Sequence, residues 1–289
     1  MALRKAGVNP SKFQKNQIKY LVILLPVALF MALPIIFIFN HAFKPMDELF
    51  AFPPTFFVRN FSWENFENLI DASQIASVPL SRYVFNSLVV TVMVVSLSVI
   101  IATLAGYILS KKQFKGKHAI MEINNAALMF VPIAVAIPRY LIISFTNIDD
   151  TYFAHILPLI AMPVGLFLIK QFVDQVPDEL IEAAIIDGAT EWQIYRRIIL
   201  PLIKPATATA ALLAFQAVWN NIETSQLYIT SDSMRTLAFY MNTFAANTNL
   251  VVGQGMAAAA SLIMFLPNLV LFIVLQSQVM NTMSHSGLK

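Results

Sequence analysis

Hydrophobic residues along this chain are gathered into long stretches without charged residues. A helix that crosses a lipid bilayer needs about 20 mostly apolar residues, because hydrocarbon can satisfy neither charges nor free backbone groups. Six stretches meet this requirement and predict six transmembrane helices, at residues 20–39, 83–110, 123–145, 151–170, 205–222 and 256–280. The third is long enough only if its helix continues through Arg139 to about Phe145.

The composition supports a membrane protein. Of the 289 residues, 58% are apolar and 12% are charged, and the mean hydropathy is +0.68. A soluble domain carries roughly 25% charged residues. We therefore expect an all-α polytopic membrane protein rather than a soluble enzyme. The chain has no Cys, which excludes disulfides, thiolate metal sites and a cysteine nucleophile.

The positive charges predict the orientation of the spans, because Lys and Arg concentrate on the cytoplasmic side of a membrane. Of the 19 Lys and Arg residues, 14 fall in or beside four segments that then share one side: 1–19, 111–122, 171–204 and 281–289. Both termini are therefore predicted to be cytoplasmic. The segments 40–82 and 223–255 are predicted to be extracytoplasmic, and the first is long enough to form a small cap or a docking surface.

The cytoplasmic loop 171–204 has a helical pattern of its own. Pro177 and the two acids after it suit the first turn of a helix, where backbone amides lack partners. Gly188 ends this pattern, and a second helix is predicted to begin near Thr190. The region from Asp174 to Asp187 has five acids and no base, which suits a protein partner better than an anionic lipid surface. We expect a rigid knob of two short helices.

The same loop resembles the EAA loop of ATP-binding-cassette (ABC) importer permeases. Glu182-Ala183-Ala184, three residues, Gly188, nine residues and then Ile198-Ile199-Leu200-Pro201 meet the full spacing of that motif. Asp187 and Ala189 beside the glycine resemble the carbohydrate branch, the family of the second maltose-type permease subunit. Further matches follow in order along residues 15–289: Asn86-Ser87, Ala105-Gly106-Tyr107, Pro177-Asp178-Glu179-Leu180, Trp219-Asn220, Pro267 and Gln276.

The resemblance implies the membrane-spanning subunit of an ATP-driven importer for a sugar or oligosaccharide, and Arg139 makes an acidic sugar one of the candidates. It also implies three kinds of partner: a second permease subunit in a heterodimer, two cytoplasmic ABC ATPase subunits and an extracytoplasmic solute-binding protein. ATP and Mg would be bound by the ATPase subunits, and no cofactor by this chain. The organism would be a prokaryote, with this chain in its inner (cytoplasmic) membrane.

By the same resemblance, Glu182 would be the ionic anchor of the knob in a cleft on an ATPase subunit. Gly188 would permit the turn between the two helices, and Ala183 and Ala184 would allow close packing. The alternative is that these residues only stabilise the hairpin. The predicted coupling residues are Glu182, Ala183, Ala184, Asp187, Gly188, Ile198, Leu200 and Pro201.

The chain shows no sign of chemistry of its own. The phosphate-binding pattern G-x-x-x-x-G-K-[ST] is absent, and the four His are dispersed without metal-ligand spacing. We therefore expect no catalytic residue, no metal site and no nucleic-acid partner. His155, inside the fourth predicted span, is expected to be a packed histidine rather than a ligand.

Polar residues inside the spans are candidates for the solute path, because polar groups are costly in a membrane and tend to face a cavity or another helix. Arg139 could bond sugar hydroxyls or an acidic sugar; alternatively it reaches the membrane surface or pairs with Asp149 or Asp150. The candidate path residues are Asn86, Asn125, Arg139, Gln216, Trp219, Asn220 and Glu223. For the asparagines, bridging between helices is the preferred alternative.

The region after the fifth span departs from the family pattern. Relatives usually carry an acid directly after Trp-Asn and a proline soon after, whereas this chain has Asn221 and then Glu223. The solute therefore remains open. Two other function classes remain alternatives: an ion-coupled secondary transporter of a small polar solute, although no internal repeat is visible, and a channel, although no selectivity-filter motif is present.

Overall fold

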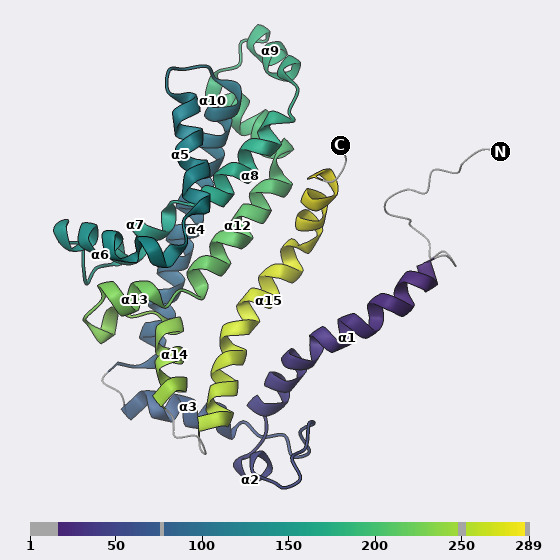
Figure 1. Cartoon of the computed structure of the whole chain (residues 1–289), viewed down its shortest axis with the longest axis vertical. Coiled ribbons are helices and arrows are strands. Elements are labelled where there is room, and N and C mark those ends of the chain that lie inside the picture. Colours follow the sequence, from purple (N-terminus) through teal and green to yellow (C-terminus); the bar gives the residue numbers. More distant parts are fainter. Residues whose placement is uncertain (1–16, 76–77, 248–252, 287–289) are drawn as a thin grey trace.

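The computed structural model describes residues 17–75, 78–247 and 253–286, and all regular secondary structure in these residues is helical (Figure 1). In chain order the elements are α1 (Gln17–Ala42), α2 (Met46–Leu49), α3 (Glu64–Ile75), α4 (Leu80–Lys111), α5 (Lys117–Met129), η1 (Pro132–Val135), α6 (Ala136–Phe145), α7 (Tyr152–Ile160), α8 (Pro163–Asp174), α9 (Asp178–Ile186), α10 (Glu191–Ile194), η2 (Tyr195–Ile199), α11 (Leu200–Leu202), α12 (Lys204–Trp219), α13 (Glu223–Tyr228), η3 (Asp232–Met234), α14 (Leu237–Asn247) and α15 (Gly253–Ser286).

Three helices are long and apolar enough to cross a membrane without interruption: α1, α4 and α15. They contain the first, second and sixth predicted spans. Three further pairs of consecutive helices are bent at a short break, and counting each pair as one span gives six. The chain is therefore a polytopic helical membrane protein.

The third predicted span is divided in the structure. Residues 123–145 were expected to form one helix, but α5 and α6 meet at 109°. The cause is Pro132, which has no N–H to donate and disfavours the helical conformation in the residue before it. Val131 is accordingly extended, with φ −73° and ψ 131°. The hydropathy and the length of an apolar stretch do not reveal a break of this kind.

The fourth predicted span is also interrupted, and a sharp bend lies just before the fifth. A bend of 43° separates α7 from α8, where Ala161 is extended and Pro163 opens the second helix. An 80° bend separates α12 from the helical turns Glu191–Leu202 before it. The fifth span ends at Trp219, because Asn220 leaves the helical conformation.

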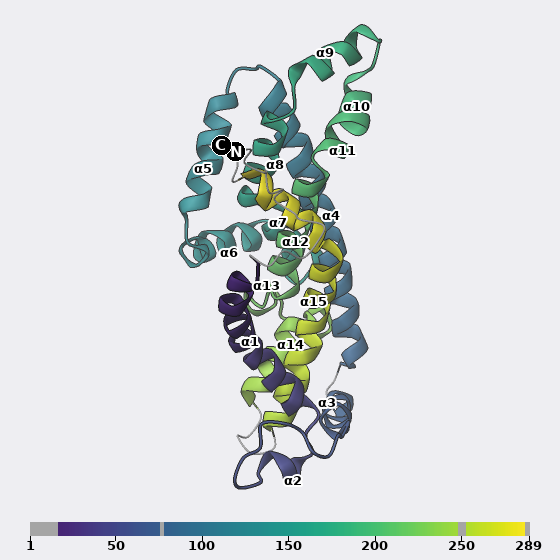
Figure 2. The ribbon, with the colours of Figure 1, turned by 90° about the vertical axis from the view of Figure 1, so that its right-hand side faces the viewer.

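The long helix α4 lies at the centre of the fold and packs against α7, α8, α12 and α14. On the other side of α12 lies α15, and α1 packs along α15 (Figure 1). The helices α9 and α10 lie at one end of the molecule, and α2 and α3 lie at the opposite end (Figures 1 and 2). One buried apolar cluster lies beneath α9 and α10, and another joins α4, α12, α14 and α15 near α3.

The segment after α1 folds into a small cap around buried polar side chains. Glu48 accepts hydrogen bonds from the backbone N–H groups of Arg59 and Asn60, at 2.8 and 3.0 Å from its carboxylate oxygens. Asn65 donates to the backbone carbonyl of Lys44 at 2.7 Å. Burial raises the pKa of Glu48, but the two N–H groups and the Lys44 ammonium outweigh it and hold that pKa below its ordinary value. The cap is therefore an ordered structure.

Candidate functional site

The first helix of the loop 171–204 is α9, and it ends in a glycine turn. Gly188 has φ +79°, a conformation that residues with a side chain rarely adopt. A Cβ at this position would meet nothing within 4 Å, so the glycine is required by the backbone and not by space. The N–H of Ala189 donates to the carbonyl of Ala184 at 2.9 Å and closes the end of the helix.

The second helix begins with a capping box. The backbone N–H of Gln193 donates to Oγ1 of Thr190 at 3.4 Å, and the Gln193 side chain accepts from the N–H of Thr190 at 2.8 Å. A wider, π-helical turn follows over Tyr195–Ile199 and leads into Pro201. We call α9, α10 and this turn the knob.

The knob is fixed to α4 by ionic contacts as well as by its apolar side. Nζ of Lys111 lies 2.7 Å from a carboxylate oxygen of Asp178, and Nζ of Lys112 lies 2.5 Å from one of Glu191. The Tyr107 hydroxyl donates to the other Glu191 oxygen at 2.8 Å. Hydrogen bonds from Lys112 and Tyr107 favour the charged carboxylate and lower the pKa of Glu191.

The outer surface of the knob exposes apolar side chains among charged ones. Ile186 has 85% of its surface exposed, and Leu180, Ile185 and Trp192 are also exposed. Glu182 is exposed on the same helix, α9. An exposed apolar surface of this kind indicates a protein–protein interface.

The predicted coupling residues divide into two groups. Those on the exposed surface are Glu182, Ala183, Asp187, Gly188 and Pro201. Those partly buried against the core beneath the knob are Ala184, Ile198 and Leu200. Their roles remain predictions; the structure shows only that the second group packs against this core.

A cleft of about 710 Å³ lies between α5, the start of α6, the break between α7 and α8, and α12. Nη1 of Arg139 lies 3.2 Å from Oε1 of Glu223 at this cleft, and the two side chains are 25% and 32% exposed. Asn221 adds an amide to the lining, and most other lining residues are apolar. The cleft therefore has mostly apolar walls and one ion pair, Arg139–Glu223, whose two charges cancel.

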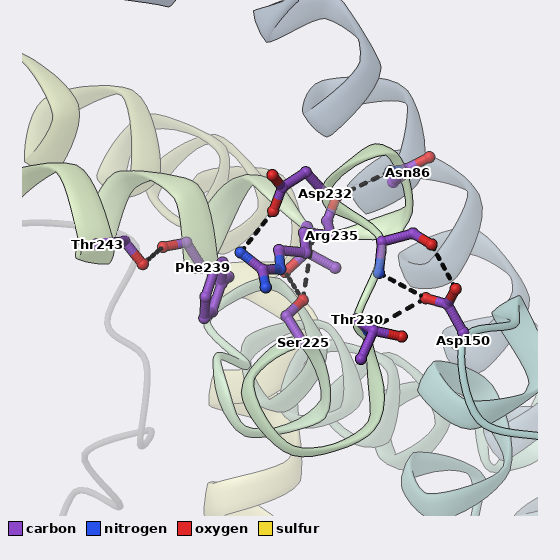
Figure 3. Close-up of polar contacts among 10 residues, drawn as sticks. Asn86, Asp150, Ser225, Thr230, Asp232, Arg235, Phe239 and Thr243 are labelled. Carbon is purple, nitrogen blue, oxygen red and sulfur yellow. Dashed lines mark hydrogen bonds and ion pairs between the residues drawn. The ribbon is translucent and has the colours of Figure 1, made fainter. Parts of the chain in front are cut away.

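The prediction that Arg139 pairs with Asp149 or Asp150 is wrong, because its partner is Glu223. Asp150 instead accepts from the N–H groups of Thr230 and Ser231, at 3.2 and 2.9 Å, in the loop after α13 (Figure 3). The Ser231 hydroxyl and, after it, these N–H groups favour the charged carboxylate and hold the pKa of Asp150 below its usual range.

The other predicted path residues lie elsewhere. Asn86 is fully buried and donates to the carbonyls of Ser233 and Arg235, so it bridges elements, as the alternative proposed. Nε1 of the buried Trp219 donates to the carbonyl of Met264 at 3.1 Å. The remaining three, Asn125, Gln216 and Asn220, are exposed outside the cleft.

His155 is packed, as predicted. It is fully buried, with Nδ1 2.8 Å from Oγ1 of Thr224 and Nε2 3.1 Å from the carbonyl of Met234. Among the described residues, no three His, Cys, Asp or Glu side chains are grouped as metal ligands.

The sequence analysis did not predict that the break between α7 and α8 lines the cleft. Pro158 and Pro163 inside the fourth apolar stretch were the available signal. Proline within a span frees backbone groups and thereby marks a site where a helix can be interrupted.

The fold is shared with solved structures of a transporter. One is a bacterial ABC transporter involved in the import of the acidic polysaccharide alginate; a chain of it aligns with TM-score 0.77 at 20% identity, covering 93% of this chain and 99% of that chain. A second structure, of a bacterial alginate ABC transporter in complex with its pentasaccharide-bound periplasmic protein, aligns with TM-score 0.60 at 16% identity.

Curated relatives of similar length align over most of the chain. The inner membrane ABC transporter permease protein YcjP of Escherichia coli is 28% identical over 86% of this chain and 88% of its own. The diacetylchitobiose uptake system permease protein DasC of Streptomyces coelicolor is 28% identical over 91% and 94%. The melibiose/raffinose/stachyose import permease protein MelC of Bacillus subtilis is 29% identical over 78% and 81%.

The family described as binding-protein-dependent transport system inner membrane component matches residues 7–279, which is nearly the whole chain. With its bent helical spans and its alignment to permeases along most of their length, this chain belongs to that family.

Proposed function

We propose that this chain is the membrane-spanning permease subunit of an ATP-driven importer and forms half of the translocation path for a sugar or oligosaccharide. The proposal rests on the family and on relatives named for diacetylchitobiose and for melibiose, raffinose and stachyose. The observation that carries it is the knob, a rigid projection with an exposed apolar surface at one end of the molecule.

The knob is the surface on which a cytoplasmic ATPase subunit docks. Ile186 and the other exposed apolar side chains lose contact with water on docking, and Glu182 pairs with a basic group of the partner. Because Lys111 and Lys112 tie the knob to α4, a displacement of the docked ATPase reaches the spans. ATP and Mg are bound by the ATPase subunits, and this chain is non-catalytic.

The proposed orientation places the knob in the cytoplasm together with both termini. In its support, α15 ends in the half of the molecule that holds α9, and α1 runs from about mid-height toward the cap and α3 at the other end (Figure 1). The extracytoplasmic end then faces a solute-binding protein. A second permease subunit supplies the other half of the path.

The cleft at Arg139 and Glu223 is this subunit's part of the path. Its apolar walls suit the C–H faces of sugar rings, and the polar atoms of Asn221 and the charge pair suit hydroxyl groups. Since the two charges compensate each other, the cleft favours an uncharged sugar.

Gentle affinity purification of the tagged chain tests the proposal. We expect a second permease and an ABC ATPase in the eluate, and a sugar-loaded binding protein should raise the rate of ATP hydrolysis. In the variant Ile186→Asp, a charge replaces an 85% exposed apolar residue of the knob, so the ATPase should be lost. Phe52→Asp is the matched control, because Phe52 is 95% exposed in the cap at the other end.

Two results would overturn the proposal. One is retention of the ATPase by Ile186→Asp at the level of the control. The other is a chain that purifies alone and moves solute along an ion gradient without ATP, which would establish the secondary-transporter alternative.

A further inference from the structure

The helix α4 spans the distance between the knob and the opposite end of the molecule without interruption. At 1.5 Å per residue, its 32 residues extend about 48 Å. Among the described spans, α1 and α15 contain proline, and the other three are bent at breaks of 43°, 80° and 109°. Since α4 has neither proline nor break, it is the stiffest connection between the two ends.

At the knob end, three side chains of α4 and that of Lys112, which directly follows the helix, hold both helices of the knob. Besides the contacts of Tyr107, Lys111 and Lys112 described above, Oγ1 of Thr103 lies 2.8 Å from the hydroxyl oxygen of Tyr195, and this pair is buried. The knob is therefore attached to α4 at several points along its length.

At the opposite end, three side chains of α4 hold the loop at 231–237. Nδ2 of Asn86 donates to the carbonyls of Ser233 and Arg235 at 2.9 and 2.8 Å (Figure 3 labels Asn86 and Arg235). Oγ of Ser87 accepts from the N–H of Leu237 at 2.8 Å. Nε of Arg82 donates to the Ser233 carbonyl at 3.0 Å. Asn86 and Ser87 are buried, so water does not compete for these bonds.

The same loop positions α13 and, through it, the cleft. Oγ of Ser225 accepts from the N–H of Thr236 at 3.1 Å and lies 2.9 Å from its hydroxyl oxygen. Ser225 is two residues after Glu223, which carries the charge facing Arg139. The knob is therefore connected to the charge pair of the cleft through contacts at the two ends of α4, the helix between them, and α13.

We infer that α4 makes the knob and the loop at 231–237 move as one body, with Asn86 and Ser87 as positioning residues that transmit the position of the knob to the cleft. This inference rests on the proposed function, in which an ATPase displaces the knob. It goes beyond that function by naming the element and side chains that connect the two ends.

Spin-label distances in the purified full complex test the inference. Because the sequence has no Cys, labels attach within this chain only at the introduced cysteines. One label is placed at Ile186→Cys on the knob and the other at Ser233→Cys, since both residues are exposed. We expect one narrow distance distribution that is the same without nucleotide and after trapping with ATP and vanadate.

The double variant Asn86→Ala, Ser87→Ala is expected to broaden this distribution and to make its maximum shift on ATP trapping. The matched control is Ser98→Ala: Ser98 is also a buried serine of α4 with one hydrogen bond to backbone, but that bond goes to Ile160 at the end of α7. A merely structural role of Asn86 and Ser87 would lower the yield of both variants alike and would not create a nucleotide-dependent distance.

The inference is overturned if the distance in the parent chain shifts on ATP trapping, or if the double variant matches Ser98→Ala with and without nucleotide. The comparison without nucleotide tests the connection even if the complex does not hydrolyse ATP. A complex without ATPase subunits or ATP hydrolysis would instead overturn the proposed function.

Discussion

Substitution of Gly188 tests whether the geometry of the knob, and not merely its presence, is needed for transport. Its φ of +79° costs a residue with a side chain about 1–2 kcal/mol. Because a Cβ there would touch nothing within 4 Å, this backbone strain is the whole cost for a small side chain. A penalty of that size changes the population of the native turn by a factor of about 5–30.

The strain is too small to detach the knob, which is held to α4 by Lys111, Lys112, Tyr107 and Thr103. We therefore expect Gly188→Val to reach the membrane at normal abundance and to retain ATP hydrolysis but to lose uptake severalfold. Asn tolerates this conformation better, so Gly188→Asn should fall between Val and the parent. Gly188→Asp adds a negative charge beside Asp187 and should likewise uncouple ATP hydrolysis from uptake.

Gly116 provides the control, because it has φ +93°, is exposed and also has free space where a Cβ would lie. It precedes α5 and lies outside the knob. Membrane abundance, ATP hydrolysis and uptake of the sugar carried by the co-purified binding protein are measured for the whole series. Normal uptake by Gly188→Val, or an equal loss in Gly116→Val, would refute the role assigned to the turn.

Three further predictions concern charged side chains. Glu48→Gln weakens the hydrogen bonds to the buried carboxylate, which are worth about 1.5–3 kcal/mol each, and should make the cap sensitive to protease, whereas the exposed Glu64→Gln should not. Because the pKa of Glu191 is lowered, its charged carboxylate stabilises the knob at pH values above the ordinary pKa of 4.5, and this stability is lost as the pH falls through the lowered pKa. Hydrogen exchange in the knob, corrected for intrinsic rates, should show this pH dependence in the parent and not in Glu191→Gln. Arg139→Gln and Glu223→Gln should each lower the thermal stability of the complex more than the double variant, with a coupling of about 1 kcal/mol in a double-mutant cycle; additive losses would contradict the pairing.

The knob could be predicted from the sequence because its determinants are local. Pro177 before α9, Gly188 at its end and Thr190 as the next cap lie within 14 residues, and each acts on the backbone nearest to it. The structure confirms two short helices joined at this glycine. How the knob is attached to α4 could not be predicted, because those contacts join residues more than 60 positions apart.

The cleft could be predicted only in part, for the same reason. Arg139 and Glu223 were both candidates, but they are 84 residues apart and no local pattern shows that they pair. Asn86 and Trp219 have side chains that suit a sugar equally well. In the structure their polar groups are used by backbone carbonyls, and residue type does not distinguish these two uses.

The positions of the helix breaks support the cleft as the solute path. Non-helical backbone at membrane depth is tolerated only where protein covers it or where it lines a water-filled cavity. Two of the three breaks contribute to the lining of the cleft, with Phe130 after α5 and residues 161–163 between α7 and α8; Asn221, which follows the end of α12, also lines it. On the far side of the second break, Ser98 donates to the Ile160 carbonyl and Asn124 to the Pro163 carbonyl, so protein side chains bond the backbone there. The backbone at the second break is thus bonded by side chains of α4 and α5 on one side and lines the cleft on the other, which fits the proposal that the cleft admits a hydrated sugar.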